Sequence, residues 1–367
     1  MFKKFVSANK KALQKFKQNY WGVFSLAFII LLTLMAAFAY VIAPDNTINA
    51  NNGDVTISTQ KPGFTVQTVN IPLGNNYQTS VLDYMKGKEI KEQFIPVLSY
   101  NFKGDTLYYK EFSEDASTAQ TKFVLKNVFP SSDEKTIEER YIKTKKYWLG
   151  TDNQGRDYLS RLIIGARVSL AIGFVAVFIS LIIGISLGAI AGYYGGKIDA
   201  LILWFINVIW SIPTLLLVIA ITLALGKGFW QVFIAVGLTM WVEVARVVRG
   251  QVMSAKQMQY ITAARALGYN DYRIIFKHII PNIMAPVIVI SAANFASAIL
   301  VESGLSFLGL GAQVPVPSWG GMIKEHYNYI ILGKPYLALI PGAAMCLVVV
   351  AFMMIGNALR DALDVKN

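Results

Sequence analysis

Long apolar stretches alternate with polar segments along the 367 residues of this chain. Six stretches hold about 20 mainly apolar residues each, enough for a helix to cross a hydrocarbon core of about 30 Å. They cover residues 21–43, 168–192, 200–225, 229–248, 283–301 and 336–355. This pattern predicts an all-α polytopic membrane protein with six transmembrane helices, whose two termini lie on the same side. Because the first stretch is too long for a signal peptide and no clear cleavage site follows it, we expect it to be retained.

Residues 44–147, between the first two apolar stretches, form a polar block with a different pattern. Short β-prone runs at 64–69, 94–100 and 122–125 are separated by Gly, Asn and Asp turn signals. A helix is expected near 132–141. The block therefore predicts a small strand-rich domain inserted between helices 1 and 2, and the parity of the topology makes it extracytoplasmic. Two roles remain open: a stabilising cap over the membrane core, or a docking surface for a protein that delivers substrate.

Local features of the apolar stretches predict how the helices pack. Glycines recur in the second stretch, and small residues let membrane helices approach closely. They are Gly173, Gly184, Gly188 and Gly192. Pro213 lies inside the third stretch and predicts a kink, which could also serve a gate. Asp157 is placed to cap the helix that leads into the second stretch.

The distribution of charge refines this topology. Only 15% of the residues are charged, against about a quarter in a typical soluble domain, and the formal net charge is +12. Residues 1–20 carry six lysines and no acid, and residues 243–281 carry six further Lys and Arg. Short loops rich in these residues stay in the cytoplasm, which places the N-terminus and the loop after the fourth helix inside. The charge thus indicates topology and the lipid bilayer as partner, and no nucleic acid is expected.

Few residues in the apolar stretches point to chemistry. The second, third, fifth and sixth stretches carry no ionisable side chain at mid-depth, which argues against an ion-coupled carrier. Glu243 and Arg246 lie three residues apart at the cytoplasmic end of the fourth stretch, where an intrahelical pair is expected. The single Cys346 excludes an intrachain disulfide. Since the run 226–228 also lacks the residues of a phosphate-binding loop, we expect no catalytic residue, metal or cofactor on this chain.

The polar loop 250–282, between the fourth and fifth stretches, is the best candidate for a functional site. Its alanines predict a short helix over 258–267, ended by Gly268. Asn270 or Asp271 can cap a second helix over 271–278, which should end before Pro281. The small residues make one side of the first helix thin enough for a partner to approach. From these residues alone, docking of a partner and rest against anionic lipid headgroups both remain open.

The spacing within this loop resembles a known family. Thr262-Ala263-Ala264, then Gly268, then His278 to Pro281 are placed as in the "EAA" loop of ABC-importer permeases. The sequences around Gly268 and Pro281 are most similar to the oligopeptide, dipeptide and nickel branch. Three further strings resemble the C-type subunit of that branch, and the resemblance covers residues 148–367 densely. They are 149–161, 303–311 and 358–364. Thr262 replaces the family's glutamate, and the block 44–147 is larger than the usual segment.

The resemblance implies the type I ABC-importer permease fold and a division of labour. A second, B-type permease would complete the pore, two cytoplasmic ATPase subunits carrying ATP and Mg would dock under the loop, and an extracytoplasmic solute-binding protein would deliver di- or oligopeptides. The chain would lie in the bacterial inner membrane with both termini in the cytoplasm, and would not be an enzyme. The implied ATPase-docking residues are Tyr260, Thr262, Ala263, Ala264, Arg265, Ala266, Leu267, Gly268 and Pro281.

The expected domains are a basic segment at 1–20, the first helix at 21–43, the inserted domain at 44–147 and a permease core at 148–367. Nickel or another small solute remains an alternative cargo. A secondary peptide carrier is a second alternative, although it predicts intramembrane charges. A membrane sensor is a third, although it would favour a dedicated signalling domain inside the cell.

Overall fold

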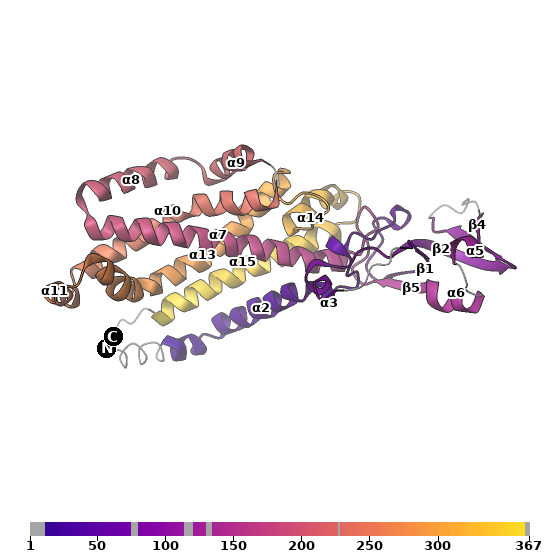
Figure 1. The fold of residues 1–367 in the computed structure, drawn as a ribbon, viewed down its shortest axis with the longest axis horizontal. Helices are drawn as coiled ribbons and strands as arrows, with labels where there is room; N and C mark the ends of the chain where they lie inside the picture. The colour runs from indigo at the N-terminus through magenta and orange to yellow at the C-terminus, as the bar shows by residue number, and fades with distance from the viewer. Residues whose placement is uncertain (1–11, 75–79, 114–119, 130–133, 227, 364–367) are drawn as a thin grey trace.

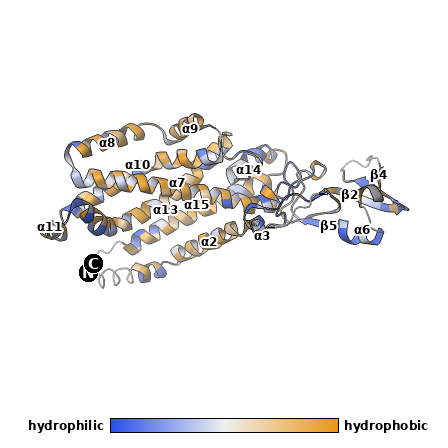
Figure 2. Ribbon diagram, viewed as in Figure 1, coloured by the Kyte–Doolittle hydropathy of each residue, from blue (hydrophilic) through white to orange (hydrophobic). Residues whose placement is uncertain are grey.

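The structure is a computed structural model that describes residues 12–74, 80–113, 120–129, 134–226 and 228–363. It is elongated, with a bundle of long helices at one end and a sheet at the other (Figure 1). Apolar residues dominate the helical bundle, whereas the sheet and its connections are more polar (Figure 2). The first eleven residues of the predicted basic segment and the last four of the chain lie outside the described residues.

Long apolar helices form the bundle. Within the described ranges, five helical runs are long and apolar enough to cross a membrane, or six if one bent pair counts as a single span. The molecule is therefore mostly helical with five or six apolar spans. The helices are α2 (Tyr20–Ala37), α7 (Tyr158–Tyr194), α8 (Gly196–Trp210), α9 (Thr214–Leu225), α10 (Phe229–Lys256), α13 (Met284–Phe307) and α15 (Tyr336–Leu363), with the shorter α14 (Trp319–His326) and the 3-10 turn η5 (Tyr327–Ile330) before α15.

The third predicted span is broken rather than gently kinked. Helices α8 and α9 meet at an angle of 92° across the residues between Trp210 and Thr214. Pro213 lies at this break, as predicted, and it explains the interruption because it has no N–H and disfavours helical geometry in the preceding residue. With 15 and 12 residues, each half is shorter than the ~20 residues that a perpendicular span needs.

Glycines on α7 provide close contact with α10. A Cβ atom at Gly184 would lie 2.5 Å from the Val244 Cβ, and one at Gly188 would lie 2.5 Å from the Ala245 carbonyl oxygen. Gly192 approaches the backbone of Arg249 in the same way. Gly173, about three turns earlier on α7, meets the ring of Phe295. The predicted close packing is confirmed, because only glycine fits these positions without moving the neighbouring helix.

The inserted segment contains a five-stranded antiparallel sheet in the order β4-β3-β2-β1-β5. Its strands are β1 (Phe64–Pro72), β2 (Glu92–Lys103), β3 (Thr106–Glu111), β4 (Gln120–Val124) and β5 (Ile142–Tyr147). The short elements around it are α3 (Ala39–Ile42), η1 (Ile48–Ala50), η2 (Val55–Ile57), α4 (Asp83–Lys86), α5 (Leu125–Val128) and α6 (Glu134–Tyr141). Strands β1, β2 and β4 coincide with predicted runs, and α6 with the predicted helix, whose residues 132 and 133 lie outside the described ranges. Strands β3 and β5 were missed, although β3 is rich in the strand-favouring Thr and Tyr; each carries a single aliphatic residue, and β5 has three lysines.

The base of the sheet is fastened to the helical bundle. Lys334 Nζ donates to Thr59 Oγ1 at 2.6 Å, and the Tyr336 hydroxyl donates to the Gln60 carbonyl at 3.0 Å. The Asp45 N–H donates to Ser160 Oγ at 2.8 Å, which ties the segment before the sheet to α7. These bonds join the sheet to the beginnings of α7 and α15.

One prediction about ionisable residues was wrong, and α13 carries one acid beyond the predicted stretch 283–301. Helix α13 continues to Phe307 and therefore includes Glu302, which is fully buried and accepts a hydrogen bond from Ser306 at 2.6 Å. Helix α10 continues to Lys256, so Glu243 lies near its middle and not at its cytoplasmic end. Arg246 does not pair with it: its guanidinium donates to Asn207 at 3.2 Å. Charge inside the helices therefore gives no argument against an ion-coupled carrier.

Candidate functional site

The polar loop between α10 and α13 lies at the end of the molecule opposite the sheet. There a short helix, α11 (Gln259–Ala266), projects beyond the ends of the long helices (Figure 1). The first residues of α2 and the last residues of α15 lie toward the same end. The helix predicted over 258–267 is confirmed, with Met258 as its N-cap residue.

One side of α11 anchors it to the bundle. Ile261 and Ala264 are buried in an apolar cluster with Val252 of α10 and Ile274 of the following segment. Tyr260 is half-buried against the same cluster. A helix of eight residues is too short to be stable alone, so this apolar contact holds it in place.

The end of α11 is a Schellman motif around Gly268. The Gly268 N–H donates to the Arg265 carbonyl at 2.9 Å, and the Tyr269 N–H donates to the Ala264 carbonyl at 3.2 Å. Gly268 has a φ of 75°, and the position of its missing Cβ has no atom within 4 Å. Glycine is favoured there because it adopts this left-handed conformation without strain. The predicted glycine stop is confirmed.

The opposite side of α11 faces outward. Of the nine predicted docking residues, six are exposed on this helix and its end: Thr262, Ala263, Arg265, Ala266, Leu267 and Gly268. Ala264 instead belongs to the buried side, so its small size serves the contact with the bundle. Leu267 is 71% exposed, and Tyr272 and Phe276 nearby are 70% and 53% exposed. Large exposed apolar side chains beside a half-buried helix are typical of an interaction surface.

The segment after α11 differs from the prediction at Pro281. Asn270 caps the next helix, as expected, by accepting from the Arg273 N–H. The helix does not end before Pro281, however: α12 (Asp271–Arg273) runs through a π-helical turn, η3 (Ile274–Ile279), and a 3-10 turn, η4 (Ile280–Ile283), into α13. Proline is tolerated because it stands in the first turn of η4, where a missing N–H costs little. Pro281 is exposed and belongs to a different element from the other predicted site residues.

Tyr193, at the end of α7, was missed by the sequence analysis. Its hydroxyl donates to Asp271 Oδ1 at 2.6 Å, and its carbonyl accepts from the Lys256 ammonium. The Arg265 guanidinium lies 5.4 Å from the centre of its ring. Tyr193 therefore joins α7, the end of α10 and the loop, and no sequence signal connects it to residues more than sixty positions away.

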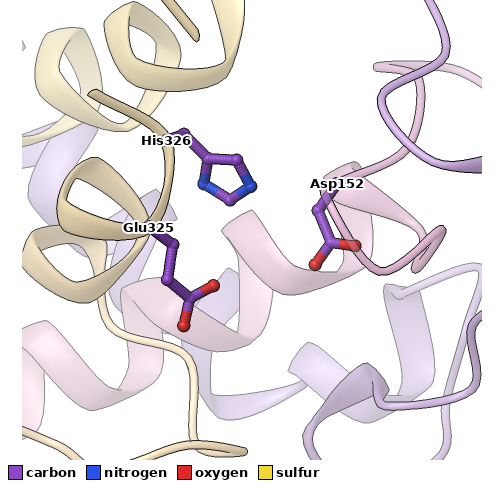
Figure 3. Close-up of side chains that lie close together, drawn as sticks. All are labelled: Asp152, Glu325 and His326. Carbon is purple, nitrogen blue, oxygen red and sulfur yellow. The ribbon is translucent and has the colours of Figure 1, made fainter. Parts of the chain in front are cut away.

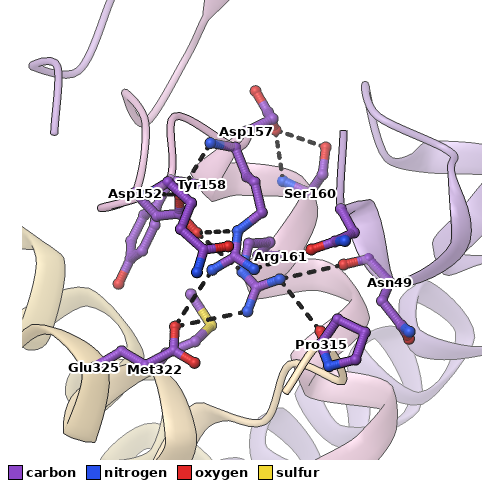
Figure 4. A network of polar contacts seen from close by, with 12 residues as sticks. Asn49, Asp152, Asp157, Tyr158, Ser160, Arg161, Pro315, Met322 and Glu325 are labelled. Carbon is purple, nitrogen blue, oxygen red and sulfur yellow. Dashed lines mark hydrogen bonds and ion pairs between the residues drawn. The ribbon is translucent and has the colours of Figure 1, made fainter. Parts of the chain in front are cut away.

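A second polar centre lies near the base of the sheet, where Asp152, Arg156 and Arg161 are almost completely buried. Figure 4 shows Asp152, Arg161 and Glu325 gathered in it. Asp152 Oδ2 lies 2.6 Å from Arg156 Nε and 3.3 Å from Arg161 Nε. Glu325 Oε2, on α14, lies 3.5 and 3.8 Å from the same two guanidinium groups. The network thus links the loop before α7 to α14. Asp157 starts α7 as predicted, accepting from the Ser160 N–H at 2.7 Å, and burial raises the pKa of its carboxyl.

His326 lies beside this network, and its side chain converges with those of Asp152 and Glu325 (Figure 3). These three residue types can ligate metals, but both Asp152 oxygens already accept hydrogen bonds, from the Gln154 and Arg156 N–H groups and from Arg156 Nε. Two guanidinium charges also oppose a cation. Burial lowers the pKa of His326, whose Nδ1 lies 2.7 Å from the Met322 carbonyl. The arrangement favours a structural ion-pair network.

Comparison with known proteins identifies the family. The family model described as "binding-protein-dependent transport system inner membrane component" matches residues 184–366. The model described as "N-terminal TM domain of oligopeptide transport permease C" matches residues 7–62. The dipeptide transport system permease protein DppC of Alkalihalophilus pseudofirmus is 45% identical over 221 residues, 60% of this chain and 72% of that protein. The chain belongs to the binding-protein-dependent transport permeases.

Other relatives of this permease place it in the same branch. The glutathione transport system permease protein GsiD of Pectobacterium atrosepticum is 41% identical over 60% of this chain and 73% of that protein. The oligopeptide transport system permease protein OppC of Bacillus subtilis is 38% identical over 61% of this chain and 73% of that protein. The predicted resemblance to the oligopeptide and dipeptide permeases is confirmed. The first family model includes all of α11, whereas the sheet lies between the two models.

Proposed function

We propose that this permease, together with a second one, forms the pore of an ATP-driven importer of di- and oligopeptides, with the type I importer fold. Three relatives are named for dipeptide, glutathione and oligopeptide transport. All three cargoes are peptides, which favours peptides over nickel or another small solute. Family membership also favours the importer over the secondary carrier and the membrane sensor.

The observation that carries the proposal is that α11 is buried on one side and exposed on the other. One side is fixed to the bundle through Ile261 and Ala264, while the other presents a low surface of Ala263 and Ala266 beside the exposed Leu267. Such a surface suits a recess on a separate ATPase subunit. Because Thr262 stands where the family has a carboxylate, the contact works by shape more than by charge. ATP and Mg belong to the two ATPase subunits, and this chain contributes no catalytic residue.

The connections of α11 give the docked ATPases a mechanical route into the pore. The helix follows α10 directly and is separated from α13 only by the turns of η3 and η4. Tyr193 adds α7 through its bonds to Asp271 and Lys256. A displacement of α11 as the ATPases close on ATP is therefore passed to three long helices as a rigid-body shift. The nucleotide on a partner thus biases the pore between two conformations.

The orientation follows from charge. Lys256, Arg265 and Arg273 lie in the loop around α11, and short basic loops stay in the cytoplasm. This supports a topology in which α11 and both termini lie on the cytoplasmic side of a bacterial inner membrane. The sheet, at the opposite end of the molecule, is then extracytoplasmic, where a solute-binding protein delivers the peptide. The hydrogen bonds that fasten the sheet to α7 and α15 favour a stabilising cap as its role.

The test is Gly268→Asp in the complex purified from detergent with its second permease and ATPases. Gly333→Asp is the matched control, because Gly333 has a φ of 77° and, like Gly268, no atom within 4 Å of its missing Cβ. Both substitutions carry a similar backbone cost of about 1 kcal/mol. We expect the Gly268→Asp complex to retain the second permease. The amount of bound ATPase, or the rate of ATP-dependent uptake, should fall at least about tenfold. Thr262→Ala should be mild.

Normal ATPase recovery and uptake in Gly268→Asp would rule out docking at α11. An equal loss in Gly333→Asp would show that the backbone strain, and not the surface, causes the effect. A wild-type complex that lacks any ATPase partner would defeat the whole proposal.

A further inference from the structure

A cavity of about 180 Å³ lies beside the break between α8 and α9. It is lined by Trp210 at the end of α8, by Thr214 at the start of α9, and by Thr239 and Glu243 on α10. Ser297 of α13 completes its polar lining. The cavity therefore combines three hydroxyl groups and one carboxylate within the apolar bundle.

Glu243 lies near the middle of α10, thirteen residues before its last residue, Lys256. At 1.5 Å per residue this is about 20 Å from that end, within the run Trp230–Lys256 that is long and apolar enough to cross a membrane. The side chain is exposed, and no side chain in the described ranges forms a hydrogen bond or ion pair with its carboxylate. Arg246, one turn further on, lies 3.5 Å from the centre of the Trp210 ring and donates to Asn207.

An exposed carboxylate on a membrane-spanning helix cannot face the lipid hydrocarbon without a large penalty. Ionisable residues in membrane helices face a water-filled cavity or a partner and mark pathways of transport. The broken helix leads to the same conclusion, because non-helical backbone at membrane depth is tolerated where it lines a cavity. The side of α10 that carries Glu243 thus faces the translocation path.

The end of α8 adds a second source of negative potential. This helix of 15 residues ends at Trp210, on the wall of the cavity. The C-terminal end of a helix carries a partial negative charge, and the ends of broken membrane helices form cation sites in transporters. The Arg246 guanidinium beside Trp210 offsets part of this potential, so the Glu243 carboxylate supplies most of the attraction for a positive charge in the cavity.

We propose that Glu243 and the end of α8 form a subsite that takes the N-terminal ammonium of a peptide in transit. This inference rests on the proposed peptide import. An ammonium has three donors, which the carboxylate and the hydroxyl oxygens of Thr214 and Thr239 can accept. One carboxylate provides too few ligands for a divalent metal, which needs a larger oxygen set. A single charge also holds the ammonium weakly enough for release, as passage through a pore requires.

The test compares uptake of tri-alanine with uptake of N-acetyl tri-alanine by the complete importer in proteoliposomes. For each variant, uptake of tri-alanine is divided by uptake of N-acetyl tri-alanine, and this ratio is divided by the wild-type ratio. The second division cancels the selectivity of the binding protein, which is the same in every experiment. We expect Glu243→Gln to lower this ratio about tenfold and Glu243→Asp to restore it to within about twofold. Glu139→Gln, the same change at an exposed position on α6, should leave the ratio unchanged.

An unchanged ratio in Glu243→Gln would overturn the inference. The inference would also be overturned if uptake of both peptides fell equally and the second permease was lost from the complex. A basic residue of that permease would then be the partner of Glu243. Absence of ATP-dependent tri-alanine uptake by the wild type would overturn the proposed function and this inference together.

A second measurement tests access independently of transport rates. Cys346 is the only cysteine of the chain, so Glu243→Cys in a Cys346→Ser background introduces a single thiol. We expect aminoethyl methanethiosulfonate, a cation, to modify it at least about fivefold faster than the sulfonatoethyl reagent, an anion. Saturating tri-alanine with binding protein should slow this modification. Failure of both water-soluble reagents to react would place the residue away from the pathway and overturn the inference.

Discussion

The glycine contacts between α7 and α10 allow a quantitative prediction. In the double variant Gly184→Ala/Gly188→Ala, the two new Cβ atoms would each lie 2.5 Å from an atom of α10. Ordinary contact requires at least about 3.4 Å, so the helices must separate by about 1 Å against a close-packed interior. Overpacking costs about 1–3 kcal/mol per site, whereas each alanine gains about 0.5–1 kcal/mol in helix propensity. With central values of about 2 and about 0.75 kcal/mol per site, the expected net loss is about 2.5 kcal/mol.

The assay is the midpoint temperature of thermal denaturation of the purified complex in detergent. With about 2–4 °C per kcal/mol, the double variant should melt roughly 5–10 °C below the wild type. Gly250→Ala is the control, because no atom lies within 4 Å of its missing Cβ and only the gain in propensity remains. A double variant as stable as Gly250→Ala would refute the view that these glycines exist for close helix contact.

Two further predictions concern the polar centre near the sheet. Asp152→Asn removes the charge that faces Arg156 and Arg161, which are each 1% exposed, so the protein should lose about 3–5 kcal/mol and melt earlier in the same assay. Because burial lowers the pKa of His326, the unfolded chain binds more protons near its ordinary pKa of about 6.5. Stability is then complete above about pH 6.5 and is lost as the pH falls toward the lowered pKa. His326→Gln should remove this dependence of the melting temperature on pH between pH 7.5 and 5, whereas the control His278→Gln should keep it. If the melting temperature of His326→Gln still changed with pH as in the wild type, His326 would not be its cause.

Features determined by neighbours in sequence could be predicted well. The helix over 258–267, its glycine stop and the cap at Asp157 depend on residues within a few positions of each other. The glycines of α7 could be recognised because their spacing alone places them on one face. The break at Pro213 was expected, but its angle depends on how α8 and α9 pack against α10, which local sequence does not determine.

Features that depend on distant residues were missed. Tyr193 meets Asp271 only in the folded molecule, and Glu325 faces Arg156 across more than 160 positions. The end of a helix also resisted prediction where an unusual turn intervenes, since η3 carries the chain past Pro281 without interruption. Glu243 was assigned to the cytoplasmic end of its helix because the hydrophobic window stops at 248, whereas the backbone remains helical to Lys256.

The length of α7 has a consequence for signalling across the membrane. Its 37 residues span about 55 Å, well beyond the ~30 Å hydrocarbon core, from the buried Asp152 network to Tyr193 beside α11. A single helix of this kind acts as a lever arm with one end in each aqueous compartment. If it tilts by about 5° about one end, the other end moves by about 5 Å, as the helix length dictates. If ATPase subunits dock at α11 as proposed, their movement would thus reach the base of the sheet without any relay of side chains through the membrane.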